Sequence, residues 1–241
     1  MNRIFGNREK WTEGLIVSGA MFAILLMYQH LVGIVSESLG DIAFDPVAYF
    51  FGNPVEFFGT FFIMICVWLA RTENILTWPT GIIGTILIGY FFLQIGLPGQ
   101  MMLNWAFFLP ISIISWYWWS YGGEGRKELP VTRLTNLARV IMVIGIAVIT
   151  SQAYFAIDYI SPGSVYPILD ALVVGASIVA QFLLGRKKWE TWVLWFGPVN
   201  AISIALFYLA GAYLVMALYV AFFVHAAIAI RTWYNESNAN G

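Results

Sequence analysis

The sequence has little charge and few groups that could react. Asp, Glu, Lys and Arg make up 10% of its 241 residues, whereas soluble domains carry roughly 25% charged residues. Hydrophobic residues make up 60%, far more than a water-exposed surface tolerates. These two figures exclude an ordinary soluble domain and indicate a chain that lies mostly within a lipid bilayer.

Other scarcities exclude classes of function. Cys66 is the single cysteine, so an intramolecular disulfide is impossible. The sequence shows no His/Cys/Glu cluster for a metal, no Ser/His/Asp grouping for a hydrolase and no phosphate-binding loop for an ATP-driven pump. The net charge of −1 argues against nucleic acid. We therefore expect no metal, no cofactor and no nucleic-acid partner.

Long apolar runs account for most of the chain, and each is about the 20 residues that a membrane helix needs. The expected spans are 14–35, 54–70, 75–95, 101–121, 136–157, 166–184, 192–209 and 212–230. The first run is too long for a signal peptide and no small-residue cleavage site follows it, so we expect it to be retained. The sequence thus predicts an all-α, multi-pass membrane protein with eight transmembrane helices.

The positions of Lys and Arg predict the orientation of these helices. All twelve basic residues lie at the termini or in even-numbered connections between the apolar runs, and the other connections contain none. Basic residues are enriched in cytoplasmic loops. Both termini are therefore expected in the cytoplasm, and the polar stretch 122–133 is expected to be a flexible cytoplasmic connection.

An internal repeat relates the second to fourth spans to the sixth to eighth. The pairs Thr77-Trp78 and Thr191-Trp192 are 114 positions apart, as are the acids Glu56 and Asp170. The fifth span links the triplets, so both enter the membrane in the same direction, as in SWEET-like transporters with parallel repeats. The expected segments are an extra N-terminal helix in 1–40, a first repeat in 54–121, a loop and linker helix in 122–160, and a second repeat in 166–231.

Acidic residues within the spans are candidates for function. Glu56 and Asp170 lie near the outer ends of their helices, and an ionisable group in a span is a functional candidate by default. Snorkelling of the carboxylates to the interface is the alternative. Asp170, Ser177 and Gln181 share one helical face, which we expect to line the protein interior.

Tryptophans form a second set of candidates, in the fourth span. Trp105, Ser112, Trp116 and Trp119 recur on one helical stripe, which could stack against a flat, cationic ring. An interfacial aromatic belt is the alternative, and Trp119 is assigned to it. Trp116 is the preferred ligand residue.

The seventh span combines tryptophans with a buried amide. Trp192 and Trp195 precede Asn200 and Ser203, and Gly197-Pro198 between them is expected to interrupt the helical hydrogen bonds. A polar group beside a helix break is typical of transporter binding sites. A hydrogen bond between two helices is the alternative role for Asn200.

These residues resemble the PnuC family of bacterial vitamin transporters, from about residue 54 to the end of the chain. The motifs are Glu56-Phe-Phe-Gly59-Thr60, Trp116-Tyr-Trp-Trp119 and, most specific, Arg186-Lys-Lys-Trp-Glu190-Thr-Trp192-Val-Leu-Trp195-x4-Asn200-Ala-Ile-Ser203. Thr77 and Thr191 stand where many members have Asn, and Ser115 stands in place of a Gly. These departures leave the vitamin open.

The resemblance implies a SWEET-like 3+1+3 core, a homotrimer, a location in the bacterial inner membrane and uptake of nicotinamide riboside by facilitated diffusion. Intracellular phosphorylation then traps the substrate. The expected partners are this small molecule and membrane lipid. The candidate substrate-binding residues are Trp116, Trp192, Trp195, Asn200, Gln94, Asn104, Asp170, Gln181, Glu56 and Ser203.

Two alternatives to this function stay open at the level of sequence. Related subfamilies take up thiamine or riboflavin, so the chain could carry another vitamin. From a different class, the chain could be an intramembrane enzyme or a sensor subunit. An enzyme needs acid, base or metal groups that converge near the membrane midplane, and the sequence indicates none.

Overall fold

The structure is a computed structural model that describes residues 54–94, 103–160, 166–209 and 213–239, with single positions at 12, 16, 19, 23 and 101. Within these residues the regular structure is helical apart from one isolated bridge between Thr132 and Lys188, which confirms the all-α prediction. The expected first span, 14–35, lies almost wholly outside the described residues. Two compact units, 1–116 and 117–241, divide the chain and are described separately.

The first unit contains a close pair of helices, α4 (Pro54–Arg71) and α5 (Thr77–Gln94). Glycines bring them together: a Cβ at Gly59 would lie 2.8 Å from the Ile88 side chain, and one at Gly84 would lie 2.8 Å from that of Ile63. Membrane helices associate by such close packing because lipid gives apolar faces no hydrophobic reason to meet. Both helices match the spans expected from the sequence.

The turn that joins α4 to α5 is a Schellman motif. The N–H of Glu73 donates to the carbonyl of Ala70 at 3.1 Å, and the N–H of Asn74 donates to that of Leu69 at 3.0 Å. Glu73 has a φ of 54°, in the left-handed region where this motif places its closing residue. The motif satisfies helix carbonyls that would otherwise lack donors.

The same turn recurs 114 positions later, between α9 (Pro167–Gly185) and α10 (Glu190–Leu194). Lys187 takes the place of Glu73 with a φ of 47°, and the N–H groups of Lys187 and Lys188 donate at 3.0 Å to the carbonyls of Leu184 and Leu183. The two turns are therefore alike in backbone geometry and in hydrogen bonds.

The two Thr-Trp pairs also make equivalent contacts. The Thr77 hydroxyl donates to the carbonyl of Cys66 at 2.8 Å, and the Thr191 hydroxyl donates to that of Ala180 at 2.7 Å. Each bond ties the start of one helix to the preceding helix across eleven positions. Both threonines are fully buried. These two equivalent positions of the repeat therefore have a structural role, which is to join neighbouring helices.

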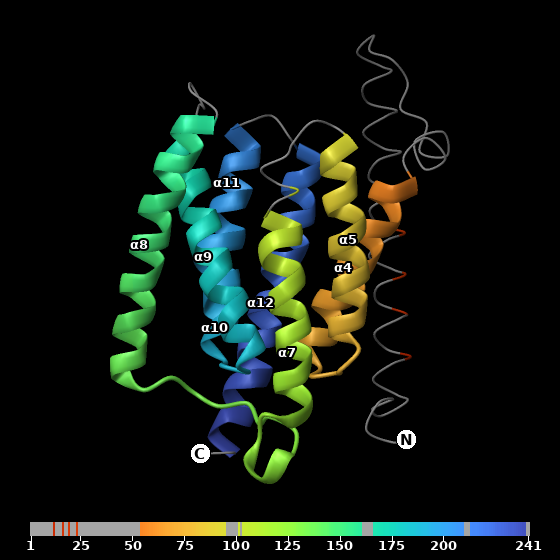
Figure 1. Cartoon of the computed structure of the whole chain (residues 1–241), viewed down its shortest axis with the longest axis vertical. Helices are drawn as coiled ribbons and strands as arrows, with labels where there is room; N and C mark the ends of the chain where they lie inside the picture. Colours follow the sequence, from red (N-terminus) through yellow and green to blue (C-terminus); the bar gives the residue numbers. More distant parts are fainter. Residues whose placement is uncertain are drawn as a thin grey trace. The chain divides into compact units, whose positions relative to one another are not determined.

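Eight helical segments contribute to the described part of the second unit. After the end of α7 (Leu109–Tyr121) come the short 3-10 helix η2 (Glu124–Arg126), α8 (Asn136–Ile160), α9, α10, the π-helix η3 (Trp195–Ala201), α11 (Ile202–Leu209) and α12 (Tyr213–Ala239). In this unit α8 packs on α9 (Figure 1). The contacts of η3 are with α9, α11 and α12, as well as with α10. Among the described helices, 136–159 and 167–185 are long and apolar enough to span a membrane. The last helix runs to Ala239, beyond the end expected at 230.

The connection between α7 and α8 is tied down, so the expectation of a flexible segment over 122–133 is wrong. The N–H of Thr132 donates to the carbonyl of Lys187 at 3.0 Å, and that of Trp189 donates to the carbonyl of Thr132 at 3.2 Å. The buried side chain of Val131 fixes the segment from inside. The Gly and polar residues of 122–133 predicted a flexible segment. Backbone hydrogen bonds to the α9–α10 turn hold its end in place instead.

Candidate functional site

A change of helix type marks the seventh span. Trp195–Ala201 forms a π-helix with Pro198 inside it. Proline has no N–H and its ring crowds the preceding turn, and π-segments are frequent at functional sites. The predicted interruption at Gly197-Pro198 thus takes the form of a π-helix between α10 and α11, and it carries the Asn200 amide.

Around this π-helix, polar groups and aromatic rings are buried together. Asn200 is 3% exposed and Ser203 is 1% exposed, and Ser203 shares a hydrogen bond with the phenol of Tyr219 in α12. Phe196 stacks on Phe223 of α12 with 4.1 Å between ring centroids. The junction of η3 and α11 therefore carries a buried amide and, within a few residues of it, a hydroxyl and a ring that contact α12, a combination that suits a flat, polar ligand.

Trp192, one turn earlier, is buried and keeps a free donor. Its side chain is 3% exposed, and its Nε1 has no hydrogen-bond partner among the residues that the structure describes. The ring lies edge-on to two residues of α12, with centroids 5.6 Å from Trp233 and 5.9 Å from His225. A buried indole N–H without an acceptor is unusual and marks a position where a ligand or water oxygen is expected.

Trp195 has different surroundings. It packs against an apolar cluster of Ala180, Leu183 and Leu194, together with residues of α8 such as Met142. This cluster is formed by α8, α9 and α10, whereas the ring contacts of Trp192 are with α12. Its apolar contacts give Trp195 a packing role in addition to the predicted contact with substrate.

The two candidates on α9 lie at the border of its buried face. That face consists largely of small residues, among them Gly175, Ala176 and Ala180, whereas Asp170 and Gln181 are half-buried. Asp170 lies in the first helical turn, where the helix dipole stabilises a carboxylate. This position gives Asp170 a structural role that requires no substrate.

The fourth span also contains a π-helix, η1 (Leu103–Phe108), and it separates residues that the sequence placed on one stripe. Asn104 is buried within it, while Trp105 donates from Nε1 to the carbonyl of Ile86 in α5 at 3.2 Å. A π-turn holds more residues than an α-turn, so spacing counted at 3.6 residues fails across it. Trp105 therefore packs on α5.

The remaining candidates of the fourth span differ in exposure. Trp116 is 40% exposed and is available to a ligand or lipid. Trp119 is fully buried and donates from Nε1 to the carbonyl of Leu184 at 3.1 Å, so its assignment to an interfacial belt is wrong. Gln94 is exposed at the end of α5, and the side chain of Glu56 lies outside the described residues.

Sequence reasoning missed the contribution of α12. Tyr219, His225 and Trp233 contact Ser203 or Trp192, yet none of the three is among the candidate residues expected from the sequence. A signal existed, since polar and aromatic side chains recur along α12 on one side of an otherwise apolar run. That signal was weak because aromatic residues are frequent throughout the chain.

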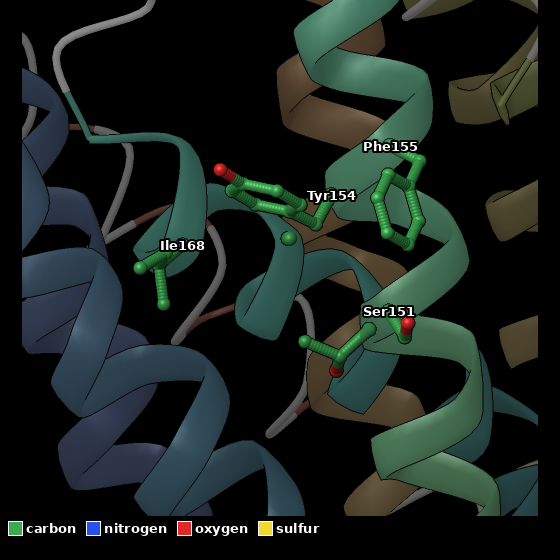
Figure 2. A pocket seen from close by; sticks show the side chains of 6 residues that line it. Ser151, Tyr154, Phe155 and Ile168 are labelled. Carbon is green, nitrogen blue, oxygen red and sulfur yellow. The ribbon is translucent and has the colours of Figure 1, made fainter.

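A cavity of about 260 Å³ lies elsewhere in the second unit, between α8 and α9. Figure 2 shows Tyr154 of α8 and Ile168 of α9 at this cavity. It is smaller than the roughly 300–1,000 Å³ of typical ligand pockets, and none of the predicted substrate residues lines it. The candidate site is therefore the η3 and α12 region and not this cavity.

Helices long and apolar enough to span a membrane, π-segments and buried amides are features that fit a membrane transporter. The model of the nicotinamide mononucleotide transporter family matches residues 53–235. The chain therefore belongs to this family, that of the PnuC transporters. Because its relatives are transporters, the alternative of an intramembrane enzyme is set aside.

Individual relatives agree with the family. The nicotinamide riboside transporter PnuC of Escherichia coli (strain K12) is 28% identical over 211 residues, which cover 78% of this chain and 87% of that protein. PnuC of Neisseria mucosa is 28% identical over 152 residues, covering 61% of this chain and 57% of that protein. A crystal structure of the vitamin B3 transporter PnuC matches 98% of this chain and all of its own with a TM-score of 0.67, and at 21% identity it shows the same fold.

Proposed function

We propose that this protein carries nicotinamide riboside across the bacterial inner membrane by facilitated diffusion, with phosphorylation inside the cell trapping the substrate. The observation that carries the proposal is the burial of two polar groups on the consecutive segments α10 and η3: the indole N–H of Trp192, which has no hydrogen-bond partner among the described residues, and the Asn200 amide. Amides and hydroxyls suit the ribose and carboxamide, and aromatic faces attract a cationic ring.

The distribution of basic residues favours the nucleoside over its phosphate ester. Phosphate groups are bound by Arg or Lys, or by N–H groups at a helix start. In the sequence, every Lys and Arg lies outside the spans or at a cytoplasmic helix end, as Arg139 does at the start of α8. None accompanies Asn200 or Trp192, so a neutral ribose fits this site better than a phosphorylated one.

The remaining candidates complete the proposed site. We assign Trp116, Trp192 and Trp195 to the pyridinium ring, and the polar contacts to Gln94, Asn104, Asp170, Gln181, Asn200, Ser203 and Glu56. We propose eight spans in a 3+1+3 parallel arrangement with both termini inside. The repeated turn and the Thr-Trp hydrogen bonds support the internal repeat, and the positions of Lys and Arg in the sequence support the orientation. Family resemblance supports a homotrimer, which multi-angle light scattering of the detergent-solubilised protein tests.

A competition-binding panel tests the substrate. Purified protein is titrated with nicotinamide riboside, nicotinamide mononucleotide, thiamine and riboflavin under one set of conditions. We expect nicotinamide riboside to bind most tightly and the mononucleotide to bind at least about tenfold more weakly, which corresponds to about 1.4 kcal/mol. Tighter binding of thiamine or riboflavin would assign the chain to another vitamin.

The Asn200→Ala variant tests the site itself. An unpaired polar group left on the substrate costs roughly 1–3 kcal/mol, so we expect the Kd for nicotinamide riboside to rise about tenfold or more. Ser151→Ala, at the apolar cavity between α8 and α9, is the control and should bind as the unchanged protein does. Equal affinity of the two variants in calorimetry would remove Asn200 from the site.

A further inference from the structure

The side chain of Lys187 is buried at the cytoplasmic turn between α9 and α10. The whole residue is 0% exposed, although a lysine ammonium normally reaches water. Its Nζ lies 3.0 Å from Oε1 of Glu128 and 4.6 Å from the ring centroid of Trp119. The Glu128 side chain is 72% exposed, whereas the Trp119 indole next to the ammonium is fully buried.

The turn itself does not require this buried cation. In the equivalent turn of the first unit, Glu73 occupies the same position with the same left-handed backbone and the same hydrogen bonds, and it is only partly buried. An acid and a base can therefore close this Schellman motif equally well. Burial of an ammonium is unfavourable unless it is compensated, so the burial of Lys187 calls for a reason beyond the turn.

The rings next to Lys187 form a continuous buried column. Trp119 lies 6.0 Å from Trp233, which lies 5.6 Å from Trp192. Trp192 is in turn 5.9 Å from His225. Trp119 and Trp233 are fully buried, and Trp192 and His225 are nearly so. We call this set of four rings the aromatic column.

The aromatic column is fixed at its Trp119 end, and its third ring, Trp192, carries an N–H without a partner among the described residues. Trp119 is held by its hydrogen bond to the Leu184 carbonyl and by the ammonium near its ring, an attraction that is strongest when the cation is desolvated. Close-packed interiors transmit strain because they contain few voids to absorb it, so a shift of Trp119 reaches Trp192 through Trp233.

We infer that Lys187 is a positioning residue for the substrate site. It holds Trp119 and, through Trp233, sets the orientation of the Trp192 indole, although it touches no substrate. This role rests on the proposed function, in which Trp192 contacts nicotinamide riboside. It also explains why the second turn carries a buried lysine where the first carries an acid.

Binding of nicotinamide riboside to the purified full chain tests the inference. In Lys187→Met, which keeps an unbranched apolar stem and removes the charge, we expect the Kd to rise about threefold to tenfold, or about 0.7–1.4 kcal/mol. Lys187→Arg keeps a cation over the indole and should recover most of the affinity. Glu128→Gln removes the ion pair but leaves the aromatic column, and should bind within about twofold of the unchanged protein.

Near-ultraviolet circular dichroism without ligand supplies a second readout, because this signal depends on the packing of indoles. Lys187→Met should alter the tryptophan bands and Glu128→Gln should not. If Lys187→Met fails to give folded protein, Trp233→Phe interrupts the aromatic column at its centre and should raise the Kd by a similar factor.

The outcomes separate the inference from the function on which it rests. Unchanged affinity and unchanged tryptophan bands in both Lys187→Met and Trp233→Phe would overturn the positioning role. A Glu128→Gln variant that is as weak as Lys187→Met would also overturn it, since the ion pair and not the aromatic column would then act. The unchanged protein could fail to bind nicotinamide riboside while the tryptophan bands of Lys187→Met still shift as expected. That result would support the packing of Lys187 on the aromatic column and would reject the proposed substrate.

Discussion

The ion pair between Arg139 and Glu190 yields an asymmetric prediction. Oε1 of Glu190 accepts from the Leu134 N–H at 3.0 Å and from Nε and Nη2 of Arg139 at 3.3 Å and 3.1 Å. Its other oxygen is buried without a partner. The Glu190 side chain is 7% exposed and that of Arg139 is 43% exposed. Removing the more exposed partner should therefore do more harm.

The magnitudes follow from what each variant leaves behind. Arg139→Ala leaves a buried carboxylate without its cation, and such a loss costs about 3 kcal/mol. Glu190→Gln leaves an arginine that reaches water and keeps an oxygen for the Leu134 N–H, so it should cost about 1 kcal/mol. For a chain of this size each kcal/mol lowers Tm by roughly 2–4 °C.

Thermal unfolding of the detergent-solubilised variants, followed by intrinsic fluorescence, measures the difference. We expect Arg139→Ala to lower Tm by roughly 6–12 °C and Glu190→Gln by roughly 2–4 °C. The double variant should resemble Glu190→Gln alone, because no buried charge is then left unpaired. A larger loss from Glu190→Gln than from Arg139→Ala would refute the reasoning.

Two further predictions concern the repeated turns. Thr77→Val and Thr191→Val each remove one buried hydrogen bond from a hydroxyl, and the two bonds are of almost equal length. Each substitution should therefore lower the free energy of unfolding by about 1 kcal/mol. Clearly unequal losses in chemical denaturation would contradict the equivalence of the two threonines. Burial lowers the pKa of Lys188 below its ordinary value of 10.5. The unfolded chain therefore binds this proton more tightly than the folded chain does. The free energy of unfolding should then rise with pH between the pKa of Lys188 in the folded chain and its pKa in the unfolded chain. Lys188→Gln should reduce that rise in thermal unfolding across alkaline pH, and an unchanged profile would contradict it.

Much of the fold could be predicted because its signals are local. Apolar runs of membrane length give the helices, and α4, α5 and α9 begin and end within about two residues of the expected limits. Landmarks such as Thr77 and Thr191 also pointed to equivalent positions, which make the same hydrogen bond in the structure. Gly197-Pro198 predicted an interruption of the helix, since proline removes a donor wherever it stands.

The rest could not be predicted because it depends on contacts between distant segments. The π-helix at 103–108 contains no proline of its own. Pro110, just after it, lacks the N–H that would donate to Ala106 in an α-helix, but a proline alone does not distinguish a π-helix from a kink, so the phase change between Trp105 and Trp116 was not predicted. The order of 122–133 comes from backbone pairing of Thr132 with the α9–α10 turn. Likewise, the burial of Lys187 and Trp119 arises from tertiary packing, which outweighs the usual preference of a lysine for water.

Uptake of radiolabelled nicotinamide riboside into liposomes that contain the purified protein tests the central claim most directly. The proposed mechanism predicts uptake that stops when the inside and outside concentrations are equal, with the same plateau with and without a proton gradient. Absence of uptake beyond that of protein-free liposomes, or accumulation that depends on the gradient, would contradict it.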